Sequence, residues 1–318
     1  MFKRTLAALA AAVCLSASAS AADYPTKPVT MVIPFVPGGS TDPVGRFLAN
    51  ALQEKWGQPV VVSNRPGAGS TIGNSEVARA KADGYTILFT TAAYTTAAAT
   101  FKSLPYDAKE DLVPVAITST SPYVVVGGSK LEAKTPAELK AFAEKEGREL
   151  FLATAGLGSS AHFAGELFLK ALGTKSKAVH YKGSSEAMLD MVAGRSDIYV
   201  GSVSAAVENI KAGQVSGLAV LGDTKSEALP NVPTTAELGL DANAFQWFGV
   251  FAPQGTPAEI IEKINADVNA VMATPEGQEI AHKFGATVRA MSVDEFGTFV
   301  HKEIDTWVAL ANELGISQ

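Results

Sequence analysis

Cysteine is almost absent from this 318-residue chain, whose single example is Cys14. Cys14 lies in an N-terminal segment with the layout of a secretory signal peptide, in which Lys3 and Arg4 precede an apolar run and then small residues. The bulky Val13 before Cys14 argues against a lipoprotein signal. Removal of residues 1–22 from 318 leaves 296 residues without cysteine, which excludes disulfides, thiolate metal sites and cysteine nucleophiles.

Long apolar runs are also missing. The N-terminal run, residues 6–15, has about half the roughly 20 residues that a membrane-spanning helix needs. Residues 19–21 and 20–22 both fit the small-x-small cleavage pattern. We therefore expect an exported protein whose mature chain begins at Asp23, with 1–22 as a cleaved signal peptide.

Basic residues are outnumbered by acidic ones. Without Lys3 and Arg4 the 26 basic residues become 24 against 32 acidic residues, a net charge of about −8. A chain of this charge with no basic run is a poor nucleic-acid binder. It has no P-loop, and residues 67–73 depart by one residue from the spacing of a dinucleotide-binding fingerprint. The four histidines show no metal-ligand spacing, so we expect no metal site. Together, the charge and the missing motifs lead us to expect no nucleic acid and no cofactor.

Along the sequence after the signal peptide, strand-like apolar runs alternate with amphipathic helical stretches. The runs at residues 29–35, 60–63 and 86–90 are separated by helical patterns at 43–56 and 70–82. This rhythm predicts an α/β fold with parallel strands. Three helix starts are predicted by capping boxes, in which a Thr or Ser precedes a Glu by three residues: Thr135 with Glu138, Thr256 with Glu259 and Ser292 with Glu295.

Two further apolar segments, 122–127 and 247–252, read as fully buried strands and as candidates for crossings between domains. They predict a first domain of residues 23–121 plus 250–318, and a second domain of residues 122–249 that includes the crossing strands. A single continuous sheet is the alternative.

Three loops combine glycine with hydroxyl side chains, and each follows a strand and opens a helix. Ligands bind at the carboxyl ends of strands in open α/β sheets, and helix N-termini attract anions. Because one loop belongs to the other predicted domain, the loops can hold both ends of a dianion across a cleft. The predicted binding residues in these loops are Gly38, Gly39, Ser40, Thr41, Asp42, Gly69, Ser70, Thr154, Gly158, Ser159, Ser160 and His162.

Hydrolysis is the rival interpretation. Ser159 or Ser160 would act as nucleophile with His162 as base, and Asp197 is available to orient the histidine. No Gly-x-Ser-x-Gly elbow is present, and a serine at a helix start is more often a cap. The sequence therefore favours binding without catalysis.

The order of motifs along the mature chain resembles the Bug-type receptors, the periplasmic solute-binding proteins of tripartite tricarboxylate transporters. The motifs that carry the resemblance are the segments 24–29, 37–46, 64–69, 104–107, 154–167, 181–183, 229–234 and 251–257. The resemblance implies a two-domain α/β fold of the type II periplasmic-binding-protein class, with a ligand cleft between domains joined by two crossings.

The resemblance also implies a function and further site residues. The chain would be a monomeric periplasmic receptor that captures a small carboxylate and delivers it to inner-membrane transporter subunits, without catalysis. Residues 91–96 and 197–202 depart from the family pattern near the expected pocket, so we add Thr91, Tyr94, Asp197 and Ser202 to the predicted site. The apolar rings of Phe35, Tyr94 and Trp247 would favour an aromatic or dicarboxylic acid.

Overall fold

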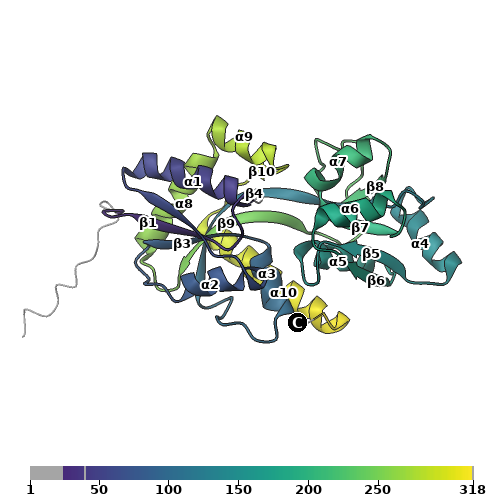
Figure 1. Ribbon diagram of the computed structural model, residues 1–318, viewed down its shortest axis with the longest axis horizontal. Coiled ribbons are helices and arrows are strands. Elements are labelled where there is room, and N and C mark those ends of the chain that lie inside the picture. Colours follow the sequence, from purple (N-terminus) through teal and green to yellow (C-terminus); the bar gives the residue numbers. More distant parts are fainter. Residues whose placement is uncertain (1–23, 39–40, 317–318) are drawn as a thin grey trace, which may run out of the picture.

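The chain folds into two lobes that are joined by two long strands (Figure 1). The computed structural model describes residues 24–38 and 41–316. We call the lobe that holds the first strand domain 1 and the other lobe domain 2. The predicted signal peptide, Gly39 and Ser40 lie outside the described residues.

Strands and helices alternate in both lobes, as the α/β prediction requires. Domain 1 contains β1 (Val29–Ile33), α1 (Thr41–Trp56), β2 (Val60–Asn64), the 3-10 helix η2 (Ala68–Ser70), α2 (Thr71–Ala78), β3 (Thr86–Thr91), α3 (Ala93–Thr100), α8 (Ala258–Met272), α9 (Pro275–Lys283), β10 (Thr287–Val288) and α10 (Val293–Leu314). Domain 2 contains α4 (Pro136–Glu146), β5 (Leu150–Thr154), α5 (Ser160–Leu172), β6 (Ser176–His180), α6 (Ser184–Val192), β7 (Ile198–Ser202), α7 (Val203–Lys211) and β8 (Ser216–Val220). The crossing strands are β4 (Leu112–Gly127) and β9 (Phe245–Pro253).

The crossing strands fix the direction of every parallel strand. The strand order is β2-β1-β3-β9-β4-β7-β5-β6, with β10 and β8 also paired to β4. Because β4 runs from domain 1 to domain 2 and β9 returns antiparallel to it, β3, antiparallel to β9, points toward domain 2. Likewise β7, antiparallel to β4, points toward domain 1. With β1 and β2 parallel to β3, and β5 and β6 parallel to β7, the carboxyl ends of the two strand sets face each other.

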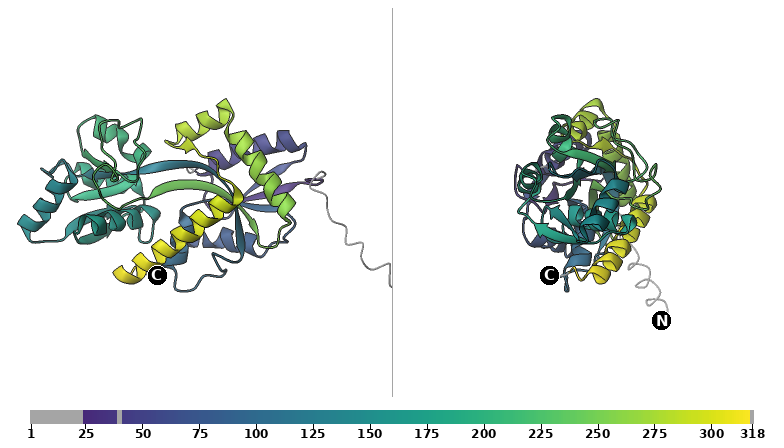
Figure 2. Two further views of the ribbon diagram at one scale, coloured as in Figure 1. Left: turned by 180° about the vertical axis from the view of Figure 1, so that it is seen from behind. Right: turned by 90° about the vertical axis from the view of Figure 1, so that its right-hand side faces the viewer.

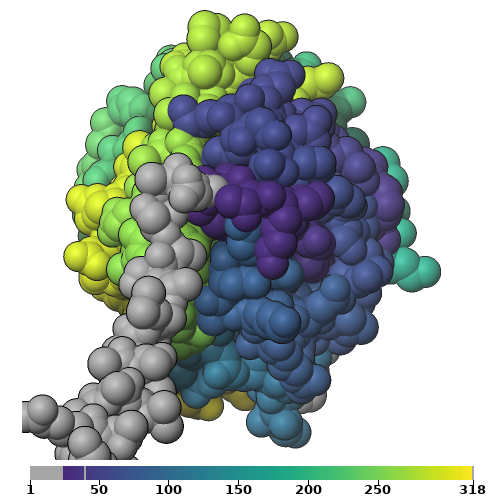
Figure 3. Space-filling model, turned by 90° about the vertical axis from the view of Figure 1, so that its left-hand side faces the viewer, coloured from purple at the N-terminus to yellow at the C-terminus, as the bar shows by residue number. Residues whose placement is uncertain are grey.

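Helices bury an apolar face on both sides of the sheet in each domain. In domain 1, α1 and α8 cover one side, while α2, α3 and α10 cover the other. In domain 2, α4 and α5 cover one side and α6 and α7 the other. Seen from the domain 1 end (Figure 3), α1 lies beside α8 and α9, although these helices are distant in sequence. Each buried Leu, Ile or Phe side chain contributes about 1.5–3 kcal/mol.

Two of the three predicted capping boxes have their capping residue at the helix start. Ser292 forms the complete reciprocal box with Glu295, and the Thr135 hydroxyl accepts a hydrogen bond from the Glu138 amide. The prediction for Thr256 is wrong. Its hydroxyl donates to the Pro253 carbonyl at 2.8 Å, and α8 begins after an N-cap at Pro257. The local turn therefore uses the hydroxyl that a cap would need.

The division into domains remains a proposal, which the strand pairings refine. On the outward strand, β4 pairs with β9 up to Pro122 and with β7 from Tyr123. On the return strand, Phe245 already pairs with Pro122, and Phe248 pairs with Thr91 of β3. We propose a return boundary near Phe245, about five residues before the position predicted from the sequence.

Helix α10 starts on domain 1 and ends on domain 2 (Figure 2). Phe296, Val300 and Ile304 pack in the core of domain 1. Trp307, Leu310, Ala311 and Ile316 belong instead to the core of domain 2, and the Trp307 ring lies 5.6 Å from that of Phe163. The C-terminal end of the chain therefore connects the two domains in addition to β4 and β9, whereas the predicted division places all of residues 250–318 in domain 1.

A buried carboxyl group holds the middle of α10. Glu303 is 9% exposed, and its Oε2 accepts hydrogen bonds from Thr95 Oγ1 of α3 at 2.7 Å and Trp247 Nε1 of β9 at 2.8 Å. No basic side chain of the described residues forms an ion pair with it. Burial raises the pKa of Glu303 to about 7, against the lowering effect of its hydrogen-bond donors.

This pKa shift predicts a pH-dependent stability. Because the folded-state pKa lies above the unfolded value, the stabilisation is fully present below the unfolded pKa and is lost as pH rises through about 7. Urea unfolding should give a free energy about 2–3 kcal/mol lower near pH 8 than near pH 5 from this group alone. Glu303→Gln, which stays neutral, should remove most of that difference.

The control for this experiment is Glu262→Gln, which removes the same charge from an exposed position on α8. It should keep the wild-type pH dependence. An equal pH dependence in Glu303→Gln and wild type would contradict the assignment.

Candidate functional site

The candidate site lies between the opposed carboxyl ends of the two strand sets. Domain 1 presents the loops after β1, β2 and β3, and domain 2 presents the loops after β5, β6 and β7. Twelve of the sixteen predicted site residues are described in these loops or in the first turns of the helices that follow them: Gly38, Thr41, Asp42, Gly69, Ser70, Thr91, Thr154, Gly158, Ser159, Ser160, His162 and Ser202.

The loop after β1 is organised by Asp42. The Asp42 carboxylate accepts hydrogen bonds from the Gly38 amide at 3.0 Å, Arg46 Nε at 2.9 Å and Asn64 Nδ2 at 2.9 Å. Burial raises the pKa of Asp42, but these three donors outweigh it and hold that pKa below its usual range. The Asp42 carboxylate is thus already bonded to groups of its own domain. We therefore assign Asp42 a positioning role rather than the ligand contact predicted from the sequence.

The loop after β2 has an unusual backbone. Four consecutive residues have positive φ: Gly67 (131°), Ala68 (44°), Gly69 (60°) and Ser70 (83°). For Ala68 and Ser70 this conformation costs about 1–2 kcal/mol each. The Ser70 hydroxyl accepts a hydrogen bond from Asn74 Nδ2 at 3.1 Å, which helps to hold the turn. Backbone strain of this kind concentrates at ligand-binding loops.

The loop after β5 closes on itself through His162. His162 is 2% exposed, and its Nδ1 accepts a hydrogen bond from the Gly158 amide at 3.2 Å. Ser159 caps α5 by accepting from the His162 amide at 3.2 Å. Thr154 Oγ1 accepts from the Gly156 amide at 3.3 Å. These contacts shape the turn that contains Gly158.

Loops of the two domains meet at the end of α3. A Cβ on Gly69 would lie 3.2 Å from the Phe101 ring, and a Cβ on Gly158 would lie 2.4 Å from Thr100 Cγ2. Thr100 Oγ1 also lies 3.5 Å from the Gly158 carbonyl oxygen. A second contact between the domains joins Gly285 to Ser204, where a Cβ on Gly285 would lie 2.4 Å from Ser204 Cβ. A Cβ does not fit at Gly158 or Gly285 without a shift of the neighbouring residue, so the two domains approach closely at both contacts.

Three of the predicted residues are placed elsewhere. Asp197 precedes β7, at the opposite end of the strand from Ser202, and its carboxylate binds Arg148 and the Phe151 amide. It is therefore removed from the site. Tyr94 is fully buried, and its hydroxyl donates to the Ala108 carbonyl at 2.6 Å. Trp247 is likewise in the core.

The geometry does not assemble a hydrolase triad. Ser159 Oγ is used as the cap of α5, and Ser160 Oγ hydrogen-bonds Tyr123 at 2.8 Å and Gln246 at 3.2 Å. Within residues 24–38 and 41–316, no hydrogen bond joins either serine hydroxyl to the His162 ring. Asp197, the proposed orienting acid, lies at the other end of the domain.

Three polar residues near these loops were missed in the sequence. Tyr123 of β4 and Gln246 of β9 share a hydrogen bond of 2.8 Å and both contact Ser160, so they tie the crossing strands to α5. His180 ends β6 and lies beside Thr154. The rule that ligands bind at strand carboxyl ends would have found His180, had residues 176–180 been recognised as a strand.

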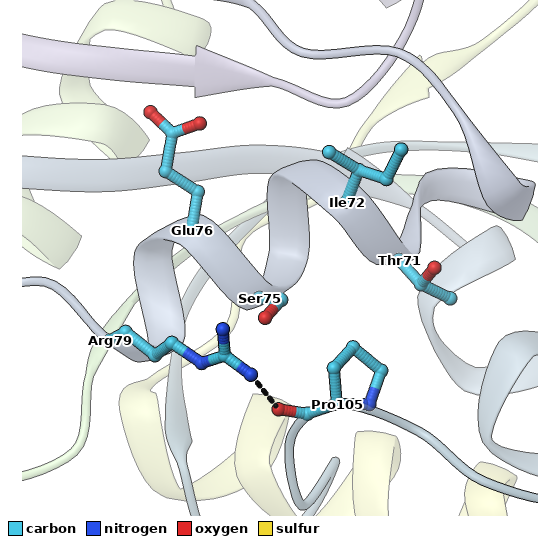
Figure 4. A pocket seen from close by; sticks show the side chains of 6 residues that line it. All are labelled: Thr71, Ile72, Ser75, Glu76, Arg79 and Pro105. Carbon is cyan, nitrogen blue, oxygen red and sulfur yellow. Dashed lines mark hydrogen bonds between the residues drawn. The ribbon is translucent and has the colours of Figure 1, made fainter.

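A shallow depression of about 360 Å³ lies on the outer side of α2 (Figure 4) and is lined by Thr71, Ile72, Ser75, Glu76, Arg79 and Pro105. Arg79 donates to the Pro105 carbonyl at its edge, at 3.0 Å. No residue of domain 2 lines it, so it lacks the two-sided geometry of the loop site. Among the described residues, no His, Cys, Asp and Glu side chains gather in a group that could hold a metal, and no helix is long and apolar enough to cross a membrane.

Comparison with known proteins places this geometry in context. Residues 44–316 match the family described as tripartite tricarboxylate transporter family receptor. The chain is 38% identical to Protein BugT of Bordetella pertussis over 304 residues, which are 95% of this chain and 93% of that protein.

Two solved structures are similar over nearly the whole chain. The first, R. palustris Rpa4515 with adipate, is 33% identical with a TM-score of 0.76, covering 93% of this chain and 100% of that one. The second, MatC from Rhodopseudomonas palustris with bound malate, is 29% identical with a TM-score of 0.73, covering 90% and 99%. These likenesses confirm the two-domain α/β fold predicted from the sequence.

We predict that Asp42→Asn destabilises the loop after β1. The asparagine keeps one acceptor oxygen and turns its amide toward donors that already point inward, so the free energy of unfolding should fall by about 1–2 kcal/mol. Urea titration measures this loss. Asp305→Asn, at an exposed position beside Lys109, is the control and should cost less than about 0.5 kcal/mol. An equal loss in both variants would contradict the role given to Asp42.

Proposed function

We propose a solute-receptor function for this chain, which belongs to the tripartite tricarboxylate transporter receptor family. This membership confirms the resemblance drawn from the sequence motifs. In our proposal the protein is a monomeric, non-catalytic receptor of the periplasm. It captures an aromatic or dicarboxylic acid between its domains and delivers the acid to inner-membrane transporter subunits.

The opposed loops are the observation that carries this proposal. Helices α1, α2 and α5 begin at these loops, and each helix N-terminus contributes roughly 0.3–1 kcal/mol toward binding a carboxylate. Arg46 of α1 and Arg65 of the loop after β2 are paired with Asp42 and Glu76, respectively. Recognition by domain 1 would therefore rest on amides and hydroxyls. Together these groups can reach micromolar affinity, about −8 kcal/mol.

The ligand class is inferred from two features. The similar structures hold adipate and malate, both dicarboxylates. In this chain, exposed apolar side chains stand in two of the loops: Val36 (59% exposed) after β1 and Leu157 (39%) after β5. Such side chains can cover the apolar body of an acid whose carboxylates bind the loops. Together these features favour an acid with a sizeable apolar body.

Calorimetry should distinguish the candidate ligands. We expect terephthalate or adipate to bind with micromolar affinity, and aspartate, which carries an ammonium group, to bind more weakly. Each of the two acids should also raise the melting temperature, since it binds only the folded state. Tight binding of aspartate alone would contradict the proposed ligand class. Consumption of the acid by the purified protein, abolished in Ser159→Ala, would favour the hydrolase instead.

The receptor must be exported for this function. We propose that the N-terminal signal peptide, residues 1–22, is cleaved before Asp23 on transfer to the periplasm. The mass of the protein recovered from a periplasmic extract should correspond to residues 23–318. A protein of full-length mass in the membrane fraction would contradict cleavage.

A further inference from the structure

A row of polar side chains that contact one another runs beneath the loop after β5. His180 Nδ1 lies 2.8 Å from Thr154 Oγ1, and the His180 ring packs edge-on against the His162 ring at 4.9 Å. His162 Nε2 lies 3.6 Å from Glu166 Oε1, which accepts a hydrogen bond from Ser176 Oγ at 2.6 Å. Within this row, His180 is exposed, whereas Thr154 and His162 are buried.

The contact with Thr154 fits a neutral His180 that carries its hydrogen on Nε2. Thr154 Oγ1 accepts from the Gly156 amide, and its own hydrogen can be donated to His180 Nδ1. A neutral imidazole that accepts at Nδ1 carries its hydrogen on Nε2. No residue of the described part of the chain hydrogen-bonds His180 Nε2. In this tautomer, an exposed N–H donor stands at the carboxyl end of β6.

His180 stands next to the loop that meets domain 1. It is the register partner of Thr154, and the following amide, of Tyr181, donates to the Thr154 carbonyl at 3.0 Å. From Thr154 the loop leads to Gly158, which contacts Thr100 across the gap between domains. His180 thus lies at the rim of the candidate site, beside the turn that reaches the other domain.

We propose that His180 donates a hydrogen bond from Nε2 to the bound carboxylate, and that the strength of this bond depends on the protonation of His180. Binding of the carboxylate makes the imidazole take up a proton at Nδ1. This inference rests on the receptor function proposed above. When Nδ1 is protonated, the Thr154 hydroxyl changes from donor to acceptor, a role open to any hydroxyl. The resulting charge-assisted hydrogen bond is roughly twice as strong as a neutral one.

The surroundings of His180 favour this proton uptake. The titratable groups that face it are His162 and Glu166 of α5, while β5 contributes the uncharged Thr154. On β6 itself, Lys177 lies over the Phe151 ring, 6.0 Å away. Burial and His162 lower the pKa of His180 in the ligand-free protein, and Glu166 opposes them. A carboxylate bound at Nε2 would raise it, so binding and protonation support each other.

The test is calorimetry with adipate, malate and terephthalate between about pH 6 and about pH 8.5, where carboxyl groups stay ionised and histidine titrates. We expect affinity for the bound probe to be about tenfold higher at the lower pH. Measurements in two buffers of different ionisation enthalpy should show proton uptake. His180→Gln keeps a neutral side-chain donor but should abolish both effects.

The matched control is His282→Gln, at an exposed position on α9 of domain 1, which should keep the wild-type pH profile. Glu166→Gln should shift the profile to lower pH, because it removes the anion that favours protonated His180. A flat wild-type profile, or the same profile in wild type and His180→Gln, would overturn the role of His180 and leave the receptor function standing. Absence of binding by all three probes at every pH would overturn the receptor function itself.

Discussion

The antiparallel pairing of β4 with β9 is the constraint on which the rest of the structure depends. The two strands pair from Leu112 with Pro253 to Pro122 with Phe245, and they carry the chain between the domains. Because β3 and β7 pair against them, the parallel strands of both domains end at the gap between the lobes. A set of helix N-termini and glycine turns is thereby brought to each side of one space.

The loops on each side are held by groups that would otherwise be free to contact a ligand. Asp42 neutralises Arg46 and fixes Gly38, and His162 fixes Gly158 from inside domain 2. The charged and ring groups of the motifs thus shape the backbone, and the amides and hydroxyls are left for recognition. The domain 1 loops can therefore contribute to binding an anion in a protein of net negative charge without a free basic residue of their own.

The connections between the domains are polar near the site and apolar away from it. Tyr123, Gln246 and Ser160 join the crossing strands to α5 through hydrogen bonds. Burial raises the pKa of Tyr123, so its hydroxyl stays protonated at neutral pH. On the other side, Trp307 of α10 packs against Phe163 of α5. Movement of one domain against the other must bend the crossing strands and accommodate the end of α10.

Most of the fold could be predicted from the sequence because its signals are local. Apolar runs, glycine turns and the capping residues Thr135 and Ser292 mark strands and helices within short windows. Whether a side chain points into the site or into the core cannot be predicted from such a short window. Tyr94 follows β3 as a ligand residue would, yet its ring faces the core formed with Tyr106 and Phe251. Asp197 was assigned to the wrong end of β7, since one sequence window does not give the start of a strand within a sheet.

Long-range packing accounts for the remaining differences. The packing of Trp307 against domain 2 depends on the path of α10 across both lobes. The apolar stripe of α10 predicts a buried helix face but not the surface against which that face packs. His180 ends a short strand of mixed burial that lacks a clear apolar run, so no local pattern marks it as a site residue.

A crystal structure of the protein with terephthalate or adipate tests the central claim most directly. We expect a carboxylate between the domains, with its oxygens about 2.7–3.2 Å from amides or hydroxyls of a domain 1 loop and of the loop at Thr154 to Ser160. A ligand bound by one domain alone, or in the depression beside α2, would contradict it.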